Sequence, residues 1–228
     1  MQIEINIPAP CEKALEILER HGYEAYLVGG CVRDSILGRE PGDWDICTNA
    51  LPEEMIAAFA DYRLVLNGLK HGTVTVIIMH TAIEITTYRI EGEYEDNRHP
   101  KEVTFTSDLA LDLSRRDFTI NALAYNQGKG VVDCFGGLED LANGVIKAVG
   151  DPYKRFHEDG LRILRAVRFA CVLGFTYDER TKDAVRDCNY LLRNIATERI
   201  QVELNKILLS PNVRQGLEDM YQLGLYSY

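Results

Sequence analysis

The stretch LVGGCVRDSILGREPGDWDICT, from Leu27 to Thr48, constrains the fold more than any other part of the sequence. A short apolar run leads into a Gly-Gly pair, and an Asp-Trp-Asp triplet follows soon after it. This pattern predicts a buried strand, a glycine turn, a short helix closed by Gly38 and a second strand over WDICT. Because residues two apart on a strand share a face, we expect Asp43 and Asp45 to point the same way.

The rest of the chain divides into two parts with different patterns. Residues 1–150 mix helix and strand signals, including a helix over EKALEILERHG that stops at Gly22 and a β-hairpin over GTVTVIIMHTAIEITTYR with a break near His80. Residues 151–228 show helical periodicity almost throughout. We therefore expect an α+β domain with a mixed or antiparallel sheet, followed by an all-helical domain. The helical pattern is not closed at the last residue, which predicts a piece of a longer protein.

Charge and cysteine usage exclude several classes of protein. The 25 Lys and Arg residues against 35 Asp and Glu residues give a net charge of −10, which argues against a general nucleic-acid coat. A polyanionic partner would need a local basic surface, and residues 154–168 qualify, with five Lys and Arg residues against two Asp and Glu residues. No apolar run approaches the roughly 20 residues that span a bilayer. The six scattered cysteines indicate buried thiols and a cytoplasmic protein.

The opening stretch combines groups that suit nucleotide chemistry. Paired carboxylates such as Asp43 and Asp45 are typical ligands of Mg²⁺, with substrate phosphates completing the shell. Two such ions, about 3.5–4 Å apart, could activate an attacking oxygen and stabilise a leaving one. Glu84, in a β-branched run, is a candidate third acid. The backbone of Gly29 and Gly30 could approach a triphosphate closely, with Arg33 as a nearby cation. The glycines and the two aspartates lie in the same short segment of sequence.

Each of these features also has an ordinary structural explanation. A DxD triplet is common in an acidic chain, and a Gly-Gly pair is more often a turn. The Arg33–Asp34 pair could be a surface ion pair of little energetic value. Glu84 could face solvent on an edge strand. Only the combination and its order favour a catalytic site.

The same stretch resembles the signature of the class II nucleotidyltransferases, the family of bacterial CCA-adding enzymes and bacterial poly(A) polymerases. Four later stretches resemble further motifs of this family in the same order: RRDFTINALAY, DCFGGLEDLANGVIKAVGDP, RFHEDGLRILRAVRFACVLGF and ERIQVELNKIL. The resemblance spans nearly the whole chain. It implies a nucleotidyltransferase head followed by a helical neck, with Mg²⁺ held by Asp43 and Asp45.

Asp159 and Arg162, in EDGLR, are candidates for choosing the nucleotide base. They are three apart on a predicted helix, and a carboxylate beside a guanidinium can meet the amino donor and ring acceptor of both cytosine and adenine. Uracil and guanine would leave polar groups mispaired. The resemblance implies the same role and extends the nucleotide contacts to Arg165 and Arg168. An ion-pair ladder on a helix surface is the alternative.

The motif RRDFTINALAY supplies three more candidates. Arg116 would suit a phosphate, Asp117 could accept a hydrogen bond from a ribose hydroxyl, and Asn121 could order the site from the same helix. A buried ion-pair network that ties the helix to the sheet is the alternative. The charged segment from residue 88 to residue 105 has the composition of a mobile loop and is similar to the flexible loop of enzymes that add both C and A.

The resemblance leads to a specific functional expectation: addition of C and A to tRNA 3′ ends from CTP and ATP, with release of pyrophosphate and no membrane partner. Within the same family, a poly(A) polymerase or an enzyme that adds only A or only CC remains open. A non-catalytic RNA- or nucleotide-binding module and an unrelated metal-dependent phosphohydrolase are alternatives from other classes. The oligomeric state is not predicted.

Overall fold

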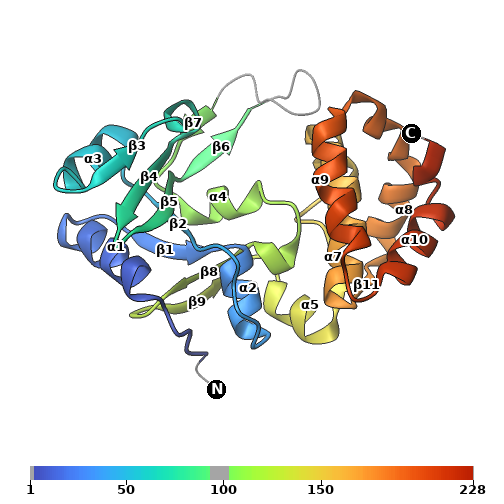
Figure 1. Ribbon diagram of the computed structural model, residues 1–228, viewed down its shortest axis with the longest axis horizontal. Coiled ribbons are helices and arrows are strands. Elements are labelled where there is room, and N and C mark those ends of the chain that lie inside the picture. The colour runs from blue at the N-terminus through green and yellow to red at the C-terminus, as the bar shows by residue number, and fades with distance from the viewer. Residues whose placement is uncertain (1–2, 93–102, 228) are drawn as a thin grey trace. The chain divides into compact units, whose positions relative to one another are not determined.

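A computed structural model describes residues 3–92 and 103–227, which form two compact units (Figure 1). We call them the head unit and the helical unit. The head unit takes its described residues from 3–90, 103–116 and 121–134, and the helical unit from 91–92, 117–120 and 135–227. Most of the predicted mobile loop, residues 93–102, lies outside the described residues.

A seven-stranded sheet forms the centre of the head unit, with the strand order β3-β4-β5-β2-β1-β8-β9. Strand β2 pairs with β5 in parallel, and the other neighbours pair antiparallel, so the predicted mixed sheet is confirmed. The strands are β1 (Ala25–Val28), β2 (Asp45–Thr48), β3 (Arg63–Val65), β4 (Thr73–Ile78), β5 (Thr81–Thr87), β8 (Leu123–Asn126) and β9 (Gly130–Asp133).

The hairpin of β4 and β5 follows the alternation of its sequence. Val76 and Ile83 face each other across the two strands and are fully buried, while the residues on either side of each one along its strand are more exposed. Its turn lies at Met79 and His80, which both adopt a positive φ. The hairpin predicted from the β-branched run is therefore confirmed.

Short helices and a small second sheet complete the head unit. Helix α1 contacts β1, β2, β4 and β5, and its apolar side chains are buried there. It stops just before Gly22, whose φ is +86°, as the sequence predicts, and α3 begins at Pro52. These elements are α1 (Ala9–Arg20), α2 (Gly30–Ile36), α3 (Pro52–Ala58), the 3₁₀ turn η1 (Leu69–His71), α4 (Leu109–Ser114), β6 (Arg89–Glu91) and β7 (Val103–Phe105).

The helical unit is built mainly from α-helices, as predicted, with one short pair of strands. Helix α7 contacts α6, α9 and α10 and is buried along most of its length. The elements are α5 (Gly137–Asn143), β10 (Val145–Ile146), α6 (Pro152–Glu158), α7 (Leu161–Leu173), β11 (Thr176–Tyr177), α8 (Glu179–Asp187), η3 (Asn189–Asn194), α9 (Thr197–Leu208), α10 (Val213–Gln222) and η4 (Leu225–Ser227).

The compact units divide earlier in the sequence than the predicted boundary between residues 150 and 151. The division falls between Cys134 and Phe135. Strand β10 pairs in parallel with β11, and α5 contacts β10. Because this backbone pairing ties the segment after residue 134 to later residues of the chain, that segment belongs to the helical unit.

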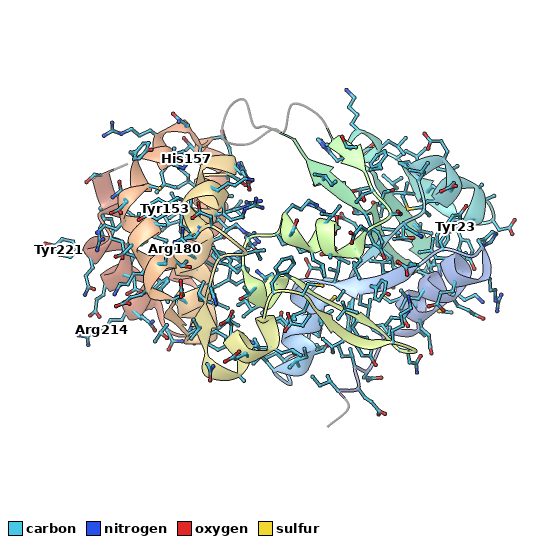
Figure 2. All side chains as sticks on the ribbon, turned by 180° about the vertical axis from the view of Figure 1, so that it is seen from behind. Tyr23, Tyr153, His157, Arg180, Arg214 and Tyr221 are labelled. Carbon is cyan, nitrogen blue, oxygen red and sulfur yellow. The ribbon has the colours of Figure 1, made fainter. Side chains whose placement is uncertain are left out.

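Exposed ion pairs lie on the outer surface of the helical unit. Arg180 and Arg214, both labelled in Figure 2, pair with Asp151 and Glu218 at 2.9 and 2.8 Å. Such pairs contribute little to stability, because water screens them and the long side chains lose entropy. Of the six free cysteines, Cys134 alone is exposed, which departs from the expectation of uniformly buried thiols. Among the described residues, no helix is both long enough and apolar enough to cross a membrane.

Gly72 and Gly38 provide a matched test of head-unit packing. Both have φ in the left-handed region, at +76° and +68°, but a Cβ at Gly72 would lie 2.6 Å from Phe105 Cε1, whereas one at Gly38 would meet nothing within 4 Å. We expect Gly38→Ala to lower the free energy of unfolding by about 1–2 kcal/mol from backbone strain. Gly72→Ala should lower it by about 1–3 kcal/mol more, from overpacking. Urea unfolding measures both, and equal losses would contradict the packing described.

Candidate active site

Three carboxylates line one cavity of about 310 Å³ in the head unit. Asp45 is the first residue of β2, and Glu84 is its Cα partner on the parallel strand β5. Asp43 precedes the strand, so the predicted strand alternation does not by itself account for its position. Glu84 is exposed, but β5 lies between β4 and β2 and is not an edge strand. The structure thus brings the two predicted metal ligands and the candidate third acid together.

The surroundings of Asp45 raise the pKa of its carboxyl group. Burial raises its pKa, and the negative charges of Asp43 and Glu84 raise it further, while Arg116 lowers it, leaving the pKa at about 6. Burial disfavours an ionised carboxylate, and so does a neighbouring like charge. Asp45 therefore holds its proton more readily than an exposed carboxyl, and a bound cation would favour its ionised form.

The donor set fits a metal ion that takes some of its ligands from the protein and the others from a substrate. Among residues 3–92 and 103–227, no group of three or more His, Cys, Asp or Glu side chains is close enough to form a complete protein metal site. Asp43 and Asp45 would supply two oxygen ligands, and phosphate oxygens and water would supply the rest. This is the usual arrangement for Mg²⁺, which keeps waters and is bound through one or two carboxylates plus substrate phosphates.

The glycine turn lies beside Arg116. Gly29 precedes α2 with a φ of +82°, and a Cβ built on it would lie 3.1 Å from Arg116 Nη1. Its own N–H donates to the carbonyl oxygen of Leu123 at 3.1 Å. The first glycine therefore serves the backbone turn and the close approach of the arginine. Asp112, which is fully buried on α4, pairs with Arg116 at 3.5 Å.

Arg33 and Asn121 meet in the head unit. The guanidinium of Arg33 is buried and donates to Asn121 Oδ1 at 2.5 Å and to the carboxylate of Asp34 at 2.9 Å. The Arg33 side chain therefore belongs to a buried network of hydrogen bonds and an ion pair, which is the structural alternative to a phosphate-binding cation. The prediction that Asn121 shares a helix with Arg116 is wrong, because α4 ends at Ser114 and residues 119–121 form the separate 3₁₀ turn η2 (Thr119–Asn121).

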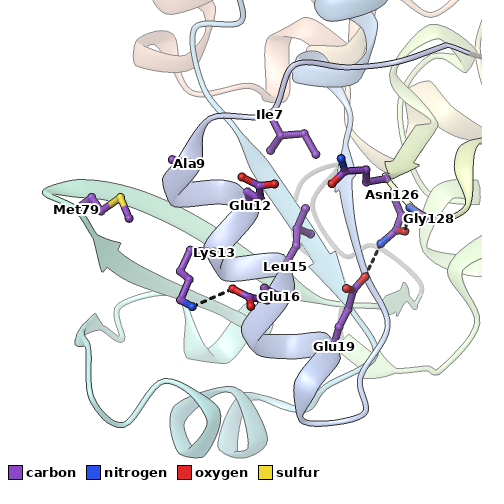
Figure 3. Close-up of a pocket in the computed structure, with 11 residues that line it drawn as sticks. Ile7, Ala9, Glu12, Lys13, Leu15, Glu16, Glu19, Met79, Asn126 and Gly128 are labelled. Carbon is purple, nitrogen blue, oxygen red and sulfur yellow. Dashed lines mark hydrogen bonds and ion pairs between the residues drawn. The ribbon is translucent and has the colours of Figure 1, made fainter.

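A larger cavity of the head unit, about 740 Å³, lies along α1 (Figure 3). Its lining carries three glutamates, and its polar groups are paired with each other: Lys13 Nζ lies 2.8 Å from Glu16, and Asn126 Nδ2 donates to Glu19 at 2.7 Å. Such a lining repels phosphate and presents no pair of carboxylates on neighbouring strands. We therefore assign the candidate active site to the smaller cavity.

In the helical unit, Asp117 holds Arg165. Its Oδ2 accepts hydrogen bonds from Arg165 Nε and Nη2 at 2.8 and 2.6 Å, and its Oδ1 accepts from the backbone N–H of Phe118 at 2.8 Å. Asp117 is buried. The candidate ribose ligand and a candidate nucleotide-contacting arginine are therefore joined as a pair.

Asp159 and Arg162 do not share a helix, which corrects the prediction. Asp159 has an extended backbone at the end of α6, Gly160 follows it, and α7 begins at Leu161. The Asp159 side chain accepts the N–H of Leu161 at 3.1 Å, which caps the start of α7. The physical reason for the break is this local capping bond, which competes with continued helix.

Each of these two side chains is held by a further charged residue. Arg199 of α9 donates from Nη1 and Nη2 to the two carboxylate oxygens of Asp159 at 3.2 and 2.9 Å. Arg162, which is buried, donates to Glu158 at 2.8 Å and to the carbonyl oxygen of Arg155 at 3.1 Å. Both groups are thus oriented by bidentate or charge-assisted hydrogen bonds, which fix direction better than neutral ones.

Glu203 of α9 completes this cluster. It is almost fully buried, its Oε2 lies 2.5 Å from Arg168 Nε, and its Oε1 lies 3.9 Å from Arg165 Nη1. The cations of the basic window are therefore largely paired with carboxylates and do not form an open basic surface.

Four of the charged residues that hold the candidate site residues were given no role in the sequence analysis. Spacing was the available signal: Asp112 is four residues before Arg116, Glu158 is four before Arg162, and Arg199 and Glu203 are four apart in ERIQVELNKIL. The residues missed are Asp112, Glu158, Arg199 and Glu203.

Comparisons with known proteins agree with this fold and site. The profile described as "Poly A polymerase head domain" matches residues 25–147, more than half of the chain, and the profile "Probable RNA and SrmB- binding site of polymerase A" matches residues 174–228. The chain belongs to the poly A polymerase head-domain family and has the fold of a nucleotidyltransferase head followed by helices. The resemblance stated from the motifs is confirmed. Members of this family depend on a divalent metal ion.

Several relatives of known name are CCA-adding enzymes. That of Limosilactobacillus reuteri (strain DSM 20016) is 51% identical over 219 residues, covering 96% of this chain and 54% of that enzyme. That of Anoxybacillus flavithermus (strain DSM 21510 / WK1) is 49% identical, covering 94% and 53%. The solved Bacillus stearothermophilus CCA-adding enzyme in complex with CTP is similar with a TM-score of 0.86 and 41% identity, covering 96% of this chain and 53% of that one. This chain spans about half the length of the curated relatives it matches.

The raised pKa of Asp45 makes a prediction about stability and pH. A carboxyl whose pKa is raised by folding destabilises the folded state once it ionises, so the penalty is absent below pH 4 and complete above pH 6. In metal-free buffer at pH 8, Asp45→Asn should raise the free energy of unfolding by about 1–2 kcal/mol, a value discounted for partial exposure. The gain should disappear toward pH 4.

Urea unfolding with a chelator at pH 8 and at pH 4 measures this difference. Asp61→Asn, at an exposed position of the same unit, is the control and should change stability little at either pH. A gain for Asp45→Asn that is the same at both pH values would contradict the charge repulsion described for the cavity.

Proposed function

We propose that the protein containing this chain adds C and A to the 3′ ends of tRNA, taking them from CTP and ATP and releasing pyrophosphate. The observation that carries the proposal is the set of three carboxylates, Asp43, Asp45 and Glu84, around one cavity of the head unit. The relatives named as CCA-adding enzymes support this choice within the family, and one of the similar solved structures is described as being in complex with CTP.

The head unit would carry out the transfer itself. Asp43 and Asp45 would hold Mg²⁺, which when bound supplies positive charge to activate the attacking oxygen and to stabilise the leaving group. The 3′-hydroxyl of the acceptor RNA would attack the α-phosphorus of the nucleotide, and the bond to pyrophosphate would break. Glu84 would add negative charge to the same cavity.

Residues around the glycine turn would receive the triphosphate. We assign Arg116 to the phosphates because it lies against Gly29 and its positive charge lowers the pKa of Asp45. Gly29 and Gly30 would allow this close approach. Arg33 and Asn121 would support the turn through their mutual hydrogen bond, since the guanidinium of Arg33 is already engaged.

The helical unit would select the nucleotide. Asp159 would accept a hydrogen bond from the base amino group and Arg162 would donate to a ring acceptor, a pattern that cytosine and adenine share. Asp117 would accept a hydrogen bond from the ribose, and Arg165 and Arg168 would contact the nucleotide as positive groups. We place the protein in the cytoplasm, where tRNA ends are processed, on the basis of its free cysteines.

Loss of either metal ligand should abolish transfer. Asp43→Ala and Asp45→Ala should each lower the rate of CTP incorporation into tRNA lacking its CCA end by at least about a hundredfold, since one lost group that stabilises transition-state charge typically costs 10²–10³ in kcat. Incorporation is measured with labelled CTP in the presence of Mg²⁺. The control, Asp61→Ala, lies at an exposed position and should retain activity. Full activity of either aspartate variant would refute the metal assignment.

Nucleotide choice should depend on the pair in the helical unit. Asp159→Ala and Arg162→Ala should each reduce discrimination between CTP and UTP by about 5- to 150-fold, because a bidentate base contact contributes roughly 1–3 kcal/mol. Competition assays with both nucleotides measure the ratio, and Arg180→Ala, in an exposed ion pair of the same unit, is the control. An unchanged ratio would remove this pair from base selection.

The same assay distinguishes the proposal from its alternatives. Addition of long A tails to arbitrary RNA would indicate a poly(A) polymerase, and nucleotide binding without incorporation would indicate a non-catalytic module. Incorporation of each nucleotide into tRNA ending before, within and after CCA tests all of these outcomes together.

A further inference from the structure

The ring of Phe169 lies close to the guanidinium groups of Arg165 and Arg168, the last two arginines of the motif RFHEDGLRILRAVRFACVLGF. Phe169 is a residue of α7 and is 5% exposed. The guanidinium carbon of Arg168 lies 3.9 Å from the centre of its ring, and that of Arg165 lies 5.3 Å from it. Both distances are within the range of about 6 Å at which the negative face of an aromatic ring attracts a cation.

Carboxylates hold other parts of the same guanidinium groups. Asp117 accepts two hydrogen bonds from Arg165, and Glu203 lies 2.5 Å from Arg168 Nε. The two hydrogen bonds to Asp117 fix the in-plane direction of the Arg165 guanidinium, and the close negative charge of Glu203 attracts the guanidinium of Arg168. An aromatic ring instead restrains the plane of the group, and it does so without adding a negative charge that would repel a triphosphate. The two kinds of contact therefore constrain different degrees of freedom.

The ring is itself fixed by a second aromatic residue. Phe118 meets Phe169 edge to face, with ring centres 5.8 Å apart and planes at 79°. Phe118 is fully buried and follows Asp117 directly in the chain, so one short segment supplies both the carboxylate for Arg165 and the support for Phe169. Edge-to-face geometry is the preferred arrangement of two aromatic rings.

We propose that Phe169 is a positioning residue that holds Arg165 and Arg168 in the orientation needed to bind a nucleoside triphosphate. The proposal rests on the proposed function for the role of the two arginines. By sequence alone, a phenylalanine at this point of an apolar helix face is a core residue. The contacts of its ring with two guanidinium groups give it a second role that ordinary core packing does not require.

Graded fluorination of the ring separates the two roles. Replacing Phe169 with mono-, di- and trifluorinated phenylalanine weakens the negative face of the ring stepwise and changes its size little. We expect the dissociation constants of CTP and ATP, measured by equilibrium binding, to rise with each fluorine, reaching about two- to thirtyfold for the trifluorinated protein. The kcat at saturating nucleotide should change less than KM. Phe169→Tyr, which keeps the aromatic face, should bind as the original protein does, and Phe169→Leu should resemble the trifluorinated form.

Phe156 gives the control, because it is a fully buried phenylalanine on α6 of the same unit. The same fluorinated series at Phe156 should leave nucleotide affinity nearly unchanged. A flat series at Phe169, or equal slopes at both positions, would show that Phe169 acts only in packing and would overturn the proposal. So would unchanged nucleotide affinity in Arg168→Ala and Arg165→Ala, since the arginines would then not contact the nucleotide.

Failure of the proposed function would look different. A protein whose nucleotide affinity follows the fluorination of Phe169, but which adds no nucleotide to tRNA, would retain the role of Phe169 and lose the assignment of CCA addition. A protein that adds C and A normally throughout the series, with no change in nucleotide affinity, would support CCA addition and refute the role of Phe169.

Discussion

The parallel pairing of β2 with β5 is the constraint on which the candidate active site depends. Its register makes Glu84 the partner of Asp45, although the two residues are far apart in sequence. The next pair along the strands is Ile46 with Ile85, and both side chains are fully buried. Burial of each such side chain contributes about 1.5–3 kcal/mol. An apolar row of the sheet thus stabilises a neighbouring row of carboxylates that repel each other.

Arg116 and Asp117 are neighbours in the chain but serve different units. Arg116 contacts Asp112 and lies against Gly29 in the head unit, where its charge lowers the pKa of Asp45. Asp117 holds Arg165 in the helical unit. One peptide bond therefore separates the arginine that lowers the pKa of Asp45 from the carboxylate that holds Arg165. This explains why a single motif can carry residues of both kinds.

The ion pairs of the helical unit are better explained by orientation than by stability. A buried ion pair recovers little net free energy, because removing two charges from water offsets most of their attraction. Even so, Arg162 is buried and pairs with Glu158, and Glu203 is buried and pairs with Arg168. The pair of Arg180 with Asp151 is instead exposed. Charged groups held in fixed directions out of water are what selective recognition of a base requires.

The sequence by itself determined the local elements and the chemical groups of this protein. Gly22 ends the first helix, Pro52 begins another, and the β-branched run forms the hairpin, because each signal acts within a few residues. Only the tertiary structure decided that Glu84 lies beside Asp45, that Arg33 is engaged by Asn121, and that segments after residue 134 join the helical unit. Strand register and ion pairing join residues that are distant in sequence, so local propensity does not predict these contacts.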